Sequence, residues 1–384
     1  MRREPMSHRP ARRGEGGQII VIAALVMIAM IGGVSLVLEG GNAYAHQRMA
    51  QNAADSVANA GATVLAERLG GATRTDADVL SAMNRMSTEN DLDAFTAYYT
   101  NVTGGLLSPA GIAVGGYGAA AQVGPADGDE TIPPGTQGVR VGGSQTFGTT
   151  FARAIGINQF TASADATAVT GALTGGQFMP VVFPVSMADC DGSGNTVIID
   201  EPWRMSNPGN PHPVGQEYIV PLCKTGGGSF MILDLDPDKN CYEEVMDPTS
   251  IQFDDFPVDV DTDTGNDCAK KIEESVTDKS LQGEVVLIPI CDDQCSTETG
   301  DNGTYHIIRI TAFYLDYLSY SDHPVNSLCE LTTSPTYGTS MVNITGGNGS
   351  SSCMAGWFVR YVTSGPVGSG AINNGEAIGV QLIR

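Results

Sequence analysis

A stretch of 20 residues without a charge, residues 19–38, constrains the fold of this chain more than any other feature. It reads IIVIAALVMIAMIGGVSLVL, and Ser35 is its only residue with a hydroxyl group. An α-helix of this length spans about 30 Å, the thickness of the hydrocarbon layer of a bilayer. A core helix of a water-soluble domain is rarely apolar on every face over such a length. The sequence therefore predicts a transmembrane helix over residues 19–38.

The charged residues on either side of this segment set its direction. Five arginines and only two glutamates lie in the first 18 residues, and Glu39 directly follows the apolar run. The positive-inside rule then predicts a basic cytoplasmic tail over residues 1–18 and an extracytoplasmic position for the chain beyond the helix. Cleavage as a signal peptide at Ala43–Ala45 is the alternative, but the apolar run exceeds the ~7–15 residues of a usual signal-peptide core. We therefore favour a retained, single-pass signal anchor in the cell membrane.

Most of the chain is acidic. Its net charge is −23 at pH 7. Five of its 20 Lys and Arg residues but only two of its 43 Asp and Glu residues precede residue 19, which leaves about −26 for the remainder. A surface of this sign repels a phosphate backbone and argues against nucleic acid as a partner. Plain solubility accounts for the charge, and binding of divalent cations is the functional alternative.

All eight cysteines lie beyond residue 189, on the side predicted to be exported. An even number of cysteines in an oxidising compartment predicts disulfides, whose pairing the sequence leaves open. A zinc site is the alternative, but CDDQC (residues 291–295) has no second Cys or His pair at zinc-finger spacing. The cysteines are Cys190, Cys223, Cys241, Cys268, Cys291, Cys295, Cys329 and Cys353.

The helical pattern continues beyond the apolar run. Residues 39–70 are rich in good helix formers, and Gly70–Gly71 ends the pattern, which predicts an alanine-rich stalk helix. Alanine recurs at every fourth position and forms a ridge without bulk, where another backbone can approach closely. The alternative is that alanine serves only as a helix former. The candidate helix-packing residues are Ala50, Ala54, Ala58, Ala62 and Ala66.

The N-terminal segment resembles a known family. A basic stretch, an apolar helix, an acidic residue at its end, a tyrosine and a QNAAD-type segment follow one another as in the TadE/TadG-like proteins of Tad (Flp-type) pilus assembly. Residues 71–175, with Phe151–Arg153, look like the α+β segment of TadG-like proteins, although less closely. The first resemblance is carried by Arg13–Gly14, Gly17–Gln18, residues 19–38, Glu39, Tyr44 and residues 51–62.

The resemblance implies a non-enzymatic role in pilus assembly, with the N-terminal helix packing against pilin or other Tad assembly proteins. This sequence differs from TadG proteins in one feature and from cleaved prepilins in another. The Asp-x-Ser-x-Ser motif of the von Willebrand A domain, which TadG proteins often carry, does not occur in the sequence. Neither Gly14, Gly16 nor Gly17 is followed five residues later by the Glu of cleaved prepilins. The resemblance therefore favours a membrane-anchored assembly component, minor-pilin-like or anchoring, over a processed major pilin.

From about residue 110 onward, short β-rich runs alternate with Gly, Pro, Asn and Asp. This pattern predicts many short strands without helices between them, and hence a sandwich or partly closed barrel. A further helical pattern lies within residues 72–100. The predicted fold class is α+β: a transmembrane helix, a stalk helix, the TadG-like segment, and a mainly β, disulfide-containing acidic ectodomain over residues 176–384.

The strongest candidate metal site is DCDGSGNTVIID, residues 189–200. Its oxygen-bearing residues fall at positions 1, 3, 5, 7 and 12 of a calcium loop, with Gly194 at the sharp turn. An Asp/Gly turn without metal is the alternative, and the looser acidic stretches at residues 234–247 and 259–267 read as solvated loops. The candidate Ca²⁺ ligands are Asp189, Asp191, Ser193, Asn195 and Asp200.

The sequence carries no recognisable catalytic motif. Gly-x-Ser-x-Gly, His-Glu-x-x-His and P-loop patterns do not occur in it. His306 alternates with apolar neighbours in a predicted strand, which indicates a structural histidine rather than a general base. We therefore expect no enzymatic activity. A calcium-stabilised surface adhesin that shares only the anchor, and an anchored secreted hydrolase, are the alternative functions.

Overall fold

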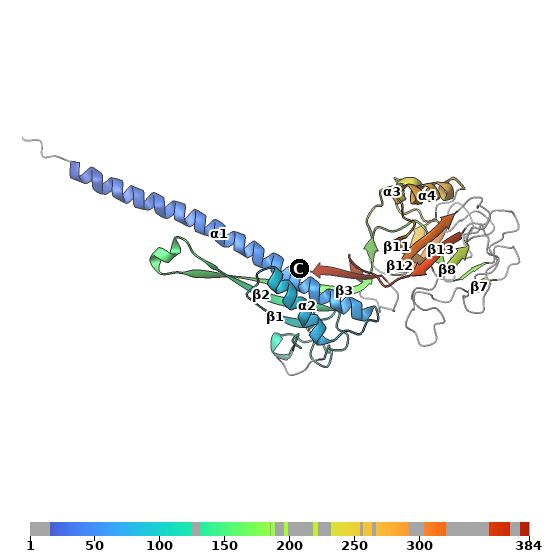
Figure 1. Ribbon diagram of the computed structural model, residues 1–384, viewed down its shortest axis with the longest axis horizontal. Coiled ribbons are helices and arrows are strands. Elements are labelled where there is room, and N and C mark those ends of the chain that lie inside the picture. The colour runs from blue at the N-terminus through green and yellow to red at the C-terminus, as the bar shows by residue number, and fades with distance from the viewer. Residues whose placement is uncertain are drawn as a thin grey trace, which may run out of the picture.

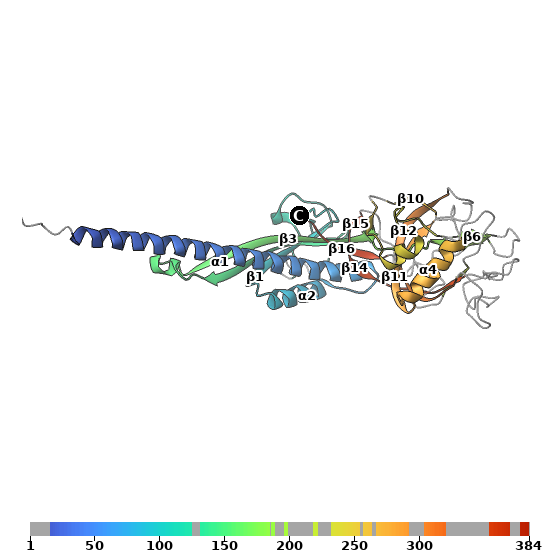
Figure 2. The same cartoon turned by 90° about the horizontal axis from the view of Figure 1, so that it is seen from above.

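The computed structural model shows an elongated protein, in which a long helix leads into one sheet-containing unit and a second unit lies at the far end (Figure 1). Seen from above, the units follow one another along the direction of the helix (Figure 2). The structure describes residues 16–124, 131–184, 186–188, 196–198, 218–221, 232–253, 256–262, 266–291, 303–319, 353–368 and 377–383.

A single helix, α1 (Gly16–Leu69), contains both the predicted transmembrane segment and the predicted stalk. Its 54 residues extend over about 80 Å. The helix ends at the predicted place because Gly71 adopts the left-handed conformation, with φ of 88°, and its N–H donates to the carbonyl of Arg68. The prediction of one continuous N-terminal helix is confirmed.

The first unit packs α1 against a six-stranded sheet, and α2 (Asp76–Glu89) lies against α1. A capping box begins α2, in which Thr75 and Asp78 each bond the backbone N–H of the other. The strand order is β1-β2-β3-β16-β14, with β15 paired to β3. These strands are β1 (Ala94–Thr100), β2 (Gly138–Gly148), β3 (Gln159–Leu173), β14 (Val362–Ser364), β15 (Val367–Gly368) and β16 (Ile378–Ile383).

Small side chains on β3 receive the helix. Every second residue from Ala162 to Ala168 is a buried alanine, while Ser163 and Asp165 between them are exposed. This alternation is the period of two that a strand imposes on its side chains. One hydrophobic core results, shared by α1, α2, β1, β2, β3 and β16.

The second unit is another six-stranded sheet, against which α3 (Cys241–Met246) and α4 (Asn266–Asp278) pack. The strand order is β5-β11-β12-β13-β8, with β10 paired to β12. A disulfide between Cys241 and Cys268 joins the two helices, and Cys291 is disulfide-bonded as well. These strands are β5 (Phe183–Pro184), β8 (Tyr218–Pro221), β10 (Val258–Asp261), β11 (Glu284–Cys291), β12 (Thr304–Ser319) and β13 (Cys353–Phe358).

Short elements complete the described structure. β4, which follows directly after β3, pairs with the later strand β9, and β6 pairs with β7. Two 3-10 helices lie in loops of the first unit. These elements are η1 (Tyr117–Ala119), η3 (Ala152–Ile155), β4 (Gly175–Gly176), β6 (Ser186–Ala188), β7 (Thr196–Ile198) and β9 (Ile251–Gln252).

The C-terminal strands return to the first unit. β16 lies antiparallel to β3, from the pair Ile378 and Ala172 to the pair Ile383 and Thr167. The second unit is therefore inserted between β3 and β14. The insertion begins after β3, which ends at Leu173, and β14 to β16, which lie beyond residue 175, form part of the first sheet. The predicted domain bounds stay a prediction.

The α+β class is confirmed, but two details of the ectodomain differ from expectation. The expectation of no helices between its strands is wrong, because α3 and α4 interrupt them. In α4, Cys268, Ile272 and Val276 are buried at helical spacing, a pattern masked in the sequence by the charged residues between them. Among the described strands, each sheet has an open strand order and packs against helices, rather than forming a sandwich or partly closed barrel.

Candidate functional site on the N-terminal helix

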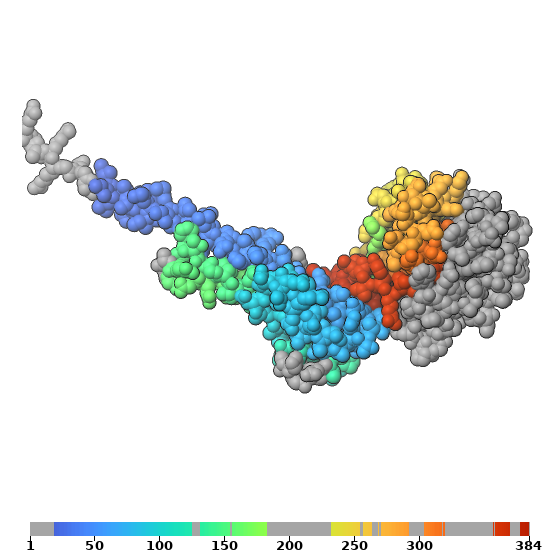
Figure 3. Space-filling view, in the orientation of Figure 1, coloured from blue at the N-terminus to red at the C-terminus, as the bar shows by residue number. Residues whose placement is uncertain are grey.

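The N-terminal part of α1 is an exposed apolar rod. All residues from Ile19 to Val34 are exposed, and the large apolar side chains between Ile19 and Leu38 are 50–76% exposed. This part of the helix projects from the folded units (Figure 3). A continuous apolar surface of this kind is unfavourable in water and stable in hydrocarbon. α1 is long and apolar enough to cross a membrane, which supports the predicted anchor.

The alanine-rich part of α1 is enclosed by the chain itself. The ridge lies in the core formed with α2 and the first sheet. At Gly61 the approach is so close that an added Cβ would lie 2.9 Å from Cγ2 of Val139 and 3.0 Å from Sδ of Met83. The ridge therefore permits a close approach, but the elements that approach it, α2 and the first sheet, belong to the same chain. The five predicted ridge residues, all 0% exposed, are Ala50, Ala54, Ala58, Ala62 and Ala66.

This placement changes where a partner helix can pack. Packing of the N-terminal helix against pilus proteins stays a prediction, and the surface open to such a partner is the exposed part of α1 rather than the ridge. Gly32, Gly33, Gly40 and Gly41 lie on that part, and nothing lies within 4 Å of a Cβ built on any of them. Small residues that permit a close approach are therefore available upstream of the ridge.

Side-chain amides of α1 bond the edge of β3. Among the described residues, 159–166 of β3 pair with β2 on one side and with no strand on the other. The amide of Gln47 donates to the carbonyl of Ser163 at 2.7 Å. One turn further along, the amide of Gln51 donates to the carbonyl of Asp165 at 3.0 Å. The helix thus satisfies edge carbonyls that would otherwise invite pairing with a foreign strand.

The predicted calcium ligands fall outside the described residues, so Ca²⁺ binding by that loop stays a prediction. Within the described part of the chain, no group of three or more His, Cys, Asp or Glu side chains is placed to hold a metal ion. The ligand residues that the structure does not describe are Asp189, Asp191, Ser193, Asn195 and Asp200.

The looser acidic stretch at residues 234–247 forms a turn followed by the whole of α3. The Asn240 side chain caps α3 by accepting bonds from two backbone N–H groups of its first turn. The buried Glu244 carboxylate accepts bonds from the N–H groups of Leu235 and Asp236, at 2.7 and 2.8 Å. These side chains therefore bond the backbone of their own segment.

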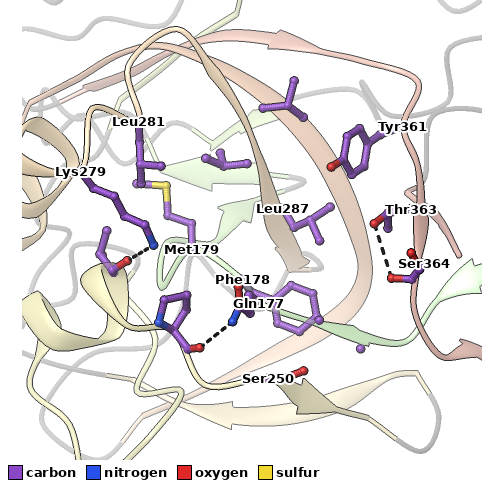
Figure 4. A pocket seen from close by; sticks show the side chains of 16 residues that line it. Gln177, Phe178, Met179, Ser250, Lys279, Leu281, Leu287, Tyr361, Thr363 and Ser364 are labelled. Carbon is purple, nitrogen blue, oxygen red and sulfur yellow. Dashed lines mark hydrogen bonds between the residues drawn. The ribbon is translucent and has the colours of Figure 1, made fainter.

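A cavity of about 470 Å³ lies where the two units meet (Figure 4). Gln177 and Lys279 line it. The side-chain amide of Gln177 donates to the carbonyl of Pro248 at 3.1 Å, and the ammonium group of Lys279 donates to the carbonyl of Val245 at 2.7 Å. The described residues that line the cavity include no His, Asp, Glu or Cys. The described lining therefore offers hydroxyl groups, such as those of Ser250 and Ser364, but none of the His or carboxylate side chains that most often act as general bases.

His306 contacts a neighbouring strand. It lies in β12 directly opposite Asp259 of β10, and its Nδ1 is 2.8 Å from Oδ1 of that carboxylate. Such a cross-strand pair links two strands of one sheet. The described contact is therefore the kind that a structural histidine makes.

The helix also matches a known family. Residues 17–64 match the model of the Tad family, the TadE/G-like proteins of Flp pilus assembly. The match begins at the start of α1 and ends at Val64, so it spans the exposed apolar part and most of the enclosed part. No curated protein and no solved structure matches the chain. The resemblance of the N-terminal segment is confirmed, and it supports a role related to pilus assembly.

Proposed function

We propose that this chain is a membrane-anchored, non-enzymatic component of Flp-type pilus assembly, either minor-pilin-like or anchoring. The observation that carries the proposal is the coincidence of the Tad match with one helix that has two environments. Its first half is exposed and apolar, and its second half is built into the core of the first unit. The positive-inside rule places the N-terminus in the cytoplasm and both units outside.

This arrangement suits a protein that transmits a displacement of its membrane segment to its extracytoplasmic units. Because the second half of α1 is part of a core rather than a free stalk, a displacement of the membrane segment moves the first sheet with it. The second unit, inserted between β3 and β14, is attached to that sheet by strands at both of its ends. The helix, the sheet and the inserted unit therefore form a continuous connection from the membrane outward.

Pilus proteins would pack against the exposed half of α1. Gly32 and Gly33 lie within this half, and nothing outside the local helix backbone is within 4 Å of an added Cβ on either, so the backbone of a second transmembrane helix can come close there. Within the bilayer, close packing of small residues is a main source of helix association. The glycines thus take the role that the sequence assigned to the alanine ridge.

A photo-crosslinking experiment in cells tests the proposal. A photoreactive amino acid is placed at Val37, which is 73% exposed, and at Ile112, a 66% exposed control in the first unit. We expect crosslinks from position 37 to pilin or assembly proteins, and their loss when Gly33→Leu is added, whereas Val26→Leu leaves them in place. Crosslinks that are absent at position 37, or identical at positions 37 and 112, would contradict the proposed contact.

A further inference from the structure

The hairpin that joins β2 to β3 reaches back along α1 toward the membrane segment (Figures 1 and 2). Its tip, residues 149–158, is closed by bonds within itself: the N–H of Thr149 donates to the carbonyl of Asn158 at 3.1 Å. The N–H of Ile157 donates to the carbonyl of Ala152, also at 3.1 Å. The tip is therefore a defined structure rather than a loose loop.

Glu39 fastens this tip to the helix. Its carboxylate accepts bonds from the consecutive backbone N–H groups of Thr150 and Phe151, at 3.2–3.3 Å. Two adjacent N–H groups that bond one carboxylate stabilise its negative charge, and both N–H groups gain an acceptor without the help of water. This pairing keeps the charge and both donors bonded beside the hydrocarbon layer, which holds no water to satisfy them.

The position of Glu39 gives the level of the tip relative to the membrane. Glu39 follows Leu38, the last residue of the apolar run, by one residue, which is about 1.5 Å along the helix. Between residues 19 and 41, only Ser35 and Glu39 are half-buried, one turn apart, and all the others are exposed. The tip therefore lies at the height where the hydrocarbon layer gives way to the headgroups.

The tip exposes the side chains that suit this height. Phe151 and Ile157 of the tip are 38% and 41% exposed, and Phe160, in β3 just after the tip, is 37% exposed. Arg153, in η3 at the end of the hairpin, is exposed as well. Aromatic and aliphatic side chains are stable at the boundary of headgroups and acyl chains, and an arginine binds lipid phosphates there.

We propose that the tip of the β2–β3 hairpin is a second membrane contact, which inserts its apolar side chains among lipid headgroups beside the anchor helix. Two contacts at different points fix the tilt of the first unit on the membrane, which a single helix leaves free. The occupant is the lipid surface itself, because the tip is fastened to the anchor where that helix leaves the bilayer. This inference rests on the anchor in the proposed function.

Fluorescence quenching on the full chain tests this contact. The chain is reconstituted into phosphatidylcholine and phosphatidylglycerol vesicles whose acyl chains carry bromine near the headgroup. One tryptophan is added at a time by Ile157→Trp, Phe151→Trp, Ile112→Trp or Leu36→Trp. The emission of the native Trp203 and Trp357 is subtracted using the unaltered chain. Ile112 is the matched control, an exposed isoleucine of the same unit, and Leu36 reports on the anchor.

We expect quenching by brominated lipid to be several-fold greater for Ile157→Trp and Phe151→Trp than for Ile112→Trp, with Leu36→Trp quenched as well. Quenching of Leu36→Trp alone, with both tip variants at the level of Ile112→Trp, would overturn the hairpin contact and leave the anchor intact. An unquenched Leu36→Trp would overturn the anchor, and the hairpin contact with it. The two tip variants are independent, so misfolding of one leaves the other as a test.

Discussion

The carboxylate of Asp76 lies buried 2.5 Å from the hydroxyl of Tyr99 and also accepts the backbone N–H of Gly124, at 3.0 and 3.1 Å. One side chain at the start of α2 thus holds a strand and a loop of the first unit. Asp76→Ala leaves a buried hydroxyl and a buried N–H without this acceptor, so we expect the free energy of unfolding to fall by about 2–4 kcal/mol. Urea denaturation of the detergent-solubilised chain measures this loss.

Glu67→Ala is the control for Asp76→Ala. Glu67 forms an exposed ion pair with Arg74, and such pairs contribute about 0–1 kcal/mol. Tyr99→Phe, alone and combined with Asp76→Ala, completes a double-mutant cycle that isolates the bond between the two side chains. If both variants lost the same free energy of unfolding, the buried carboxylate of Asp76 would contribute no more to stability than the exposed carboxylate of Glu67.

The enclosed alanine ridge gives a second expectation. Ala58 is 0% exposed, so Ala58→Leu forces extra atoms into a packed core and is expected to destabilise the first unit by about 1–3 kcal/mol. Ala45→Leu, at an exposed position of the same helix, should change stability by no more than about 0.5 kcal/mol. If Ala58→Leu instead left the unfolding curve unchanged and abolished binding of a pilus protein, the ridge would be a docking surface after all.

The capping box of α2 predicts a titration shift. The backbone N–H of Thr75, and then its hydroxyl, bond Asp78 and hold the pKa of that carboxyl below its ordinary value. The folded pKa is depressed, so the contribution to stability is present above the unfolded Asp pKa of about 3.9 and is lost as the pH falls through the folded value. Thr75→Ala removes the hydroxyl bond and should raise the pKa of Asp78, as followed by carboxyl ¹³C shifts.

Thr73→Ala is the matched control, because Thr73 is an exposed threonine in the same connection. It should leave the titration of Asp78 where it is in the unaltered chain. A pKa of Asp78 that does not respond to Thr75→Ala, or responds equally to both variants, would contradict the capping-box explanation.

Calcium binding by residues 189–200 stays open to a direct test. If the loop binds Ca²⁺ through its alternate oxygen-bearing residues, calorimetric titration of the full chain gives heat that Asp191→Ala removes. Asp259→Ala, in the second acidic stretch, is the control and should leave the heat unchanged. No heat from the unaltered chain would leave the Asp/Gly turn as the interpretation of this stretch.

The sequence predicts the features of this fold that depend on neighbouring residues. The apolar run, the alanine-rich continuation and the Gly70–Gly71 stop give α1 its extent, because helix propensity and helix ends are local properties. The alternation of small and polar residues over residues 160–169 likewise predicts β3. The strand β1, by contrast, directly follows α2, and we assigned its residues to a region of helical pattern.

The rest depends on pairing between distant segments. Nothing in the run AIGVQLI at the C-terminus indicates that it pairs with β3, more than 200 residues earlier, so the insertion of the second unit is invisible in the sequence. The alanine ridge was visible, but what covers it was not. Glu39 was likewise recognised as an acidic residue after the membrane segment, while its partners, Thr150 and Phe151, lie over 100 positions away.

Counting surface pili by electron microscopy tests the central claim most directly. The strain lacks this chain and is complemented with the full chain or with an equally expressed chain carrying Ile28→Lys and Ile31→Lys in the exposed apolar part of α1. A membrane-anchored assembly component predicts that pili are lost, that the full chain restores them, and that the charged variant does not. Normal numbers of pili in the strain without the chain would contradict a role in pilus assembly.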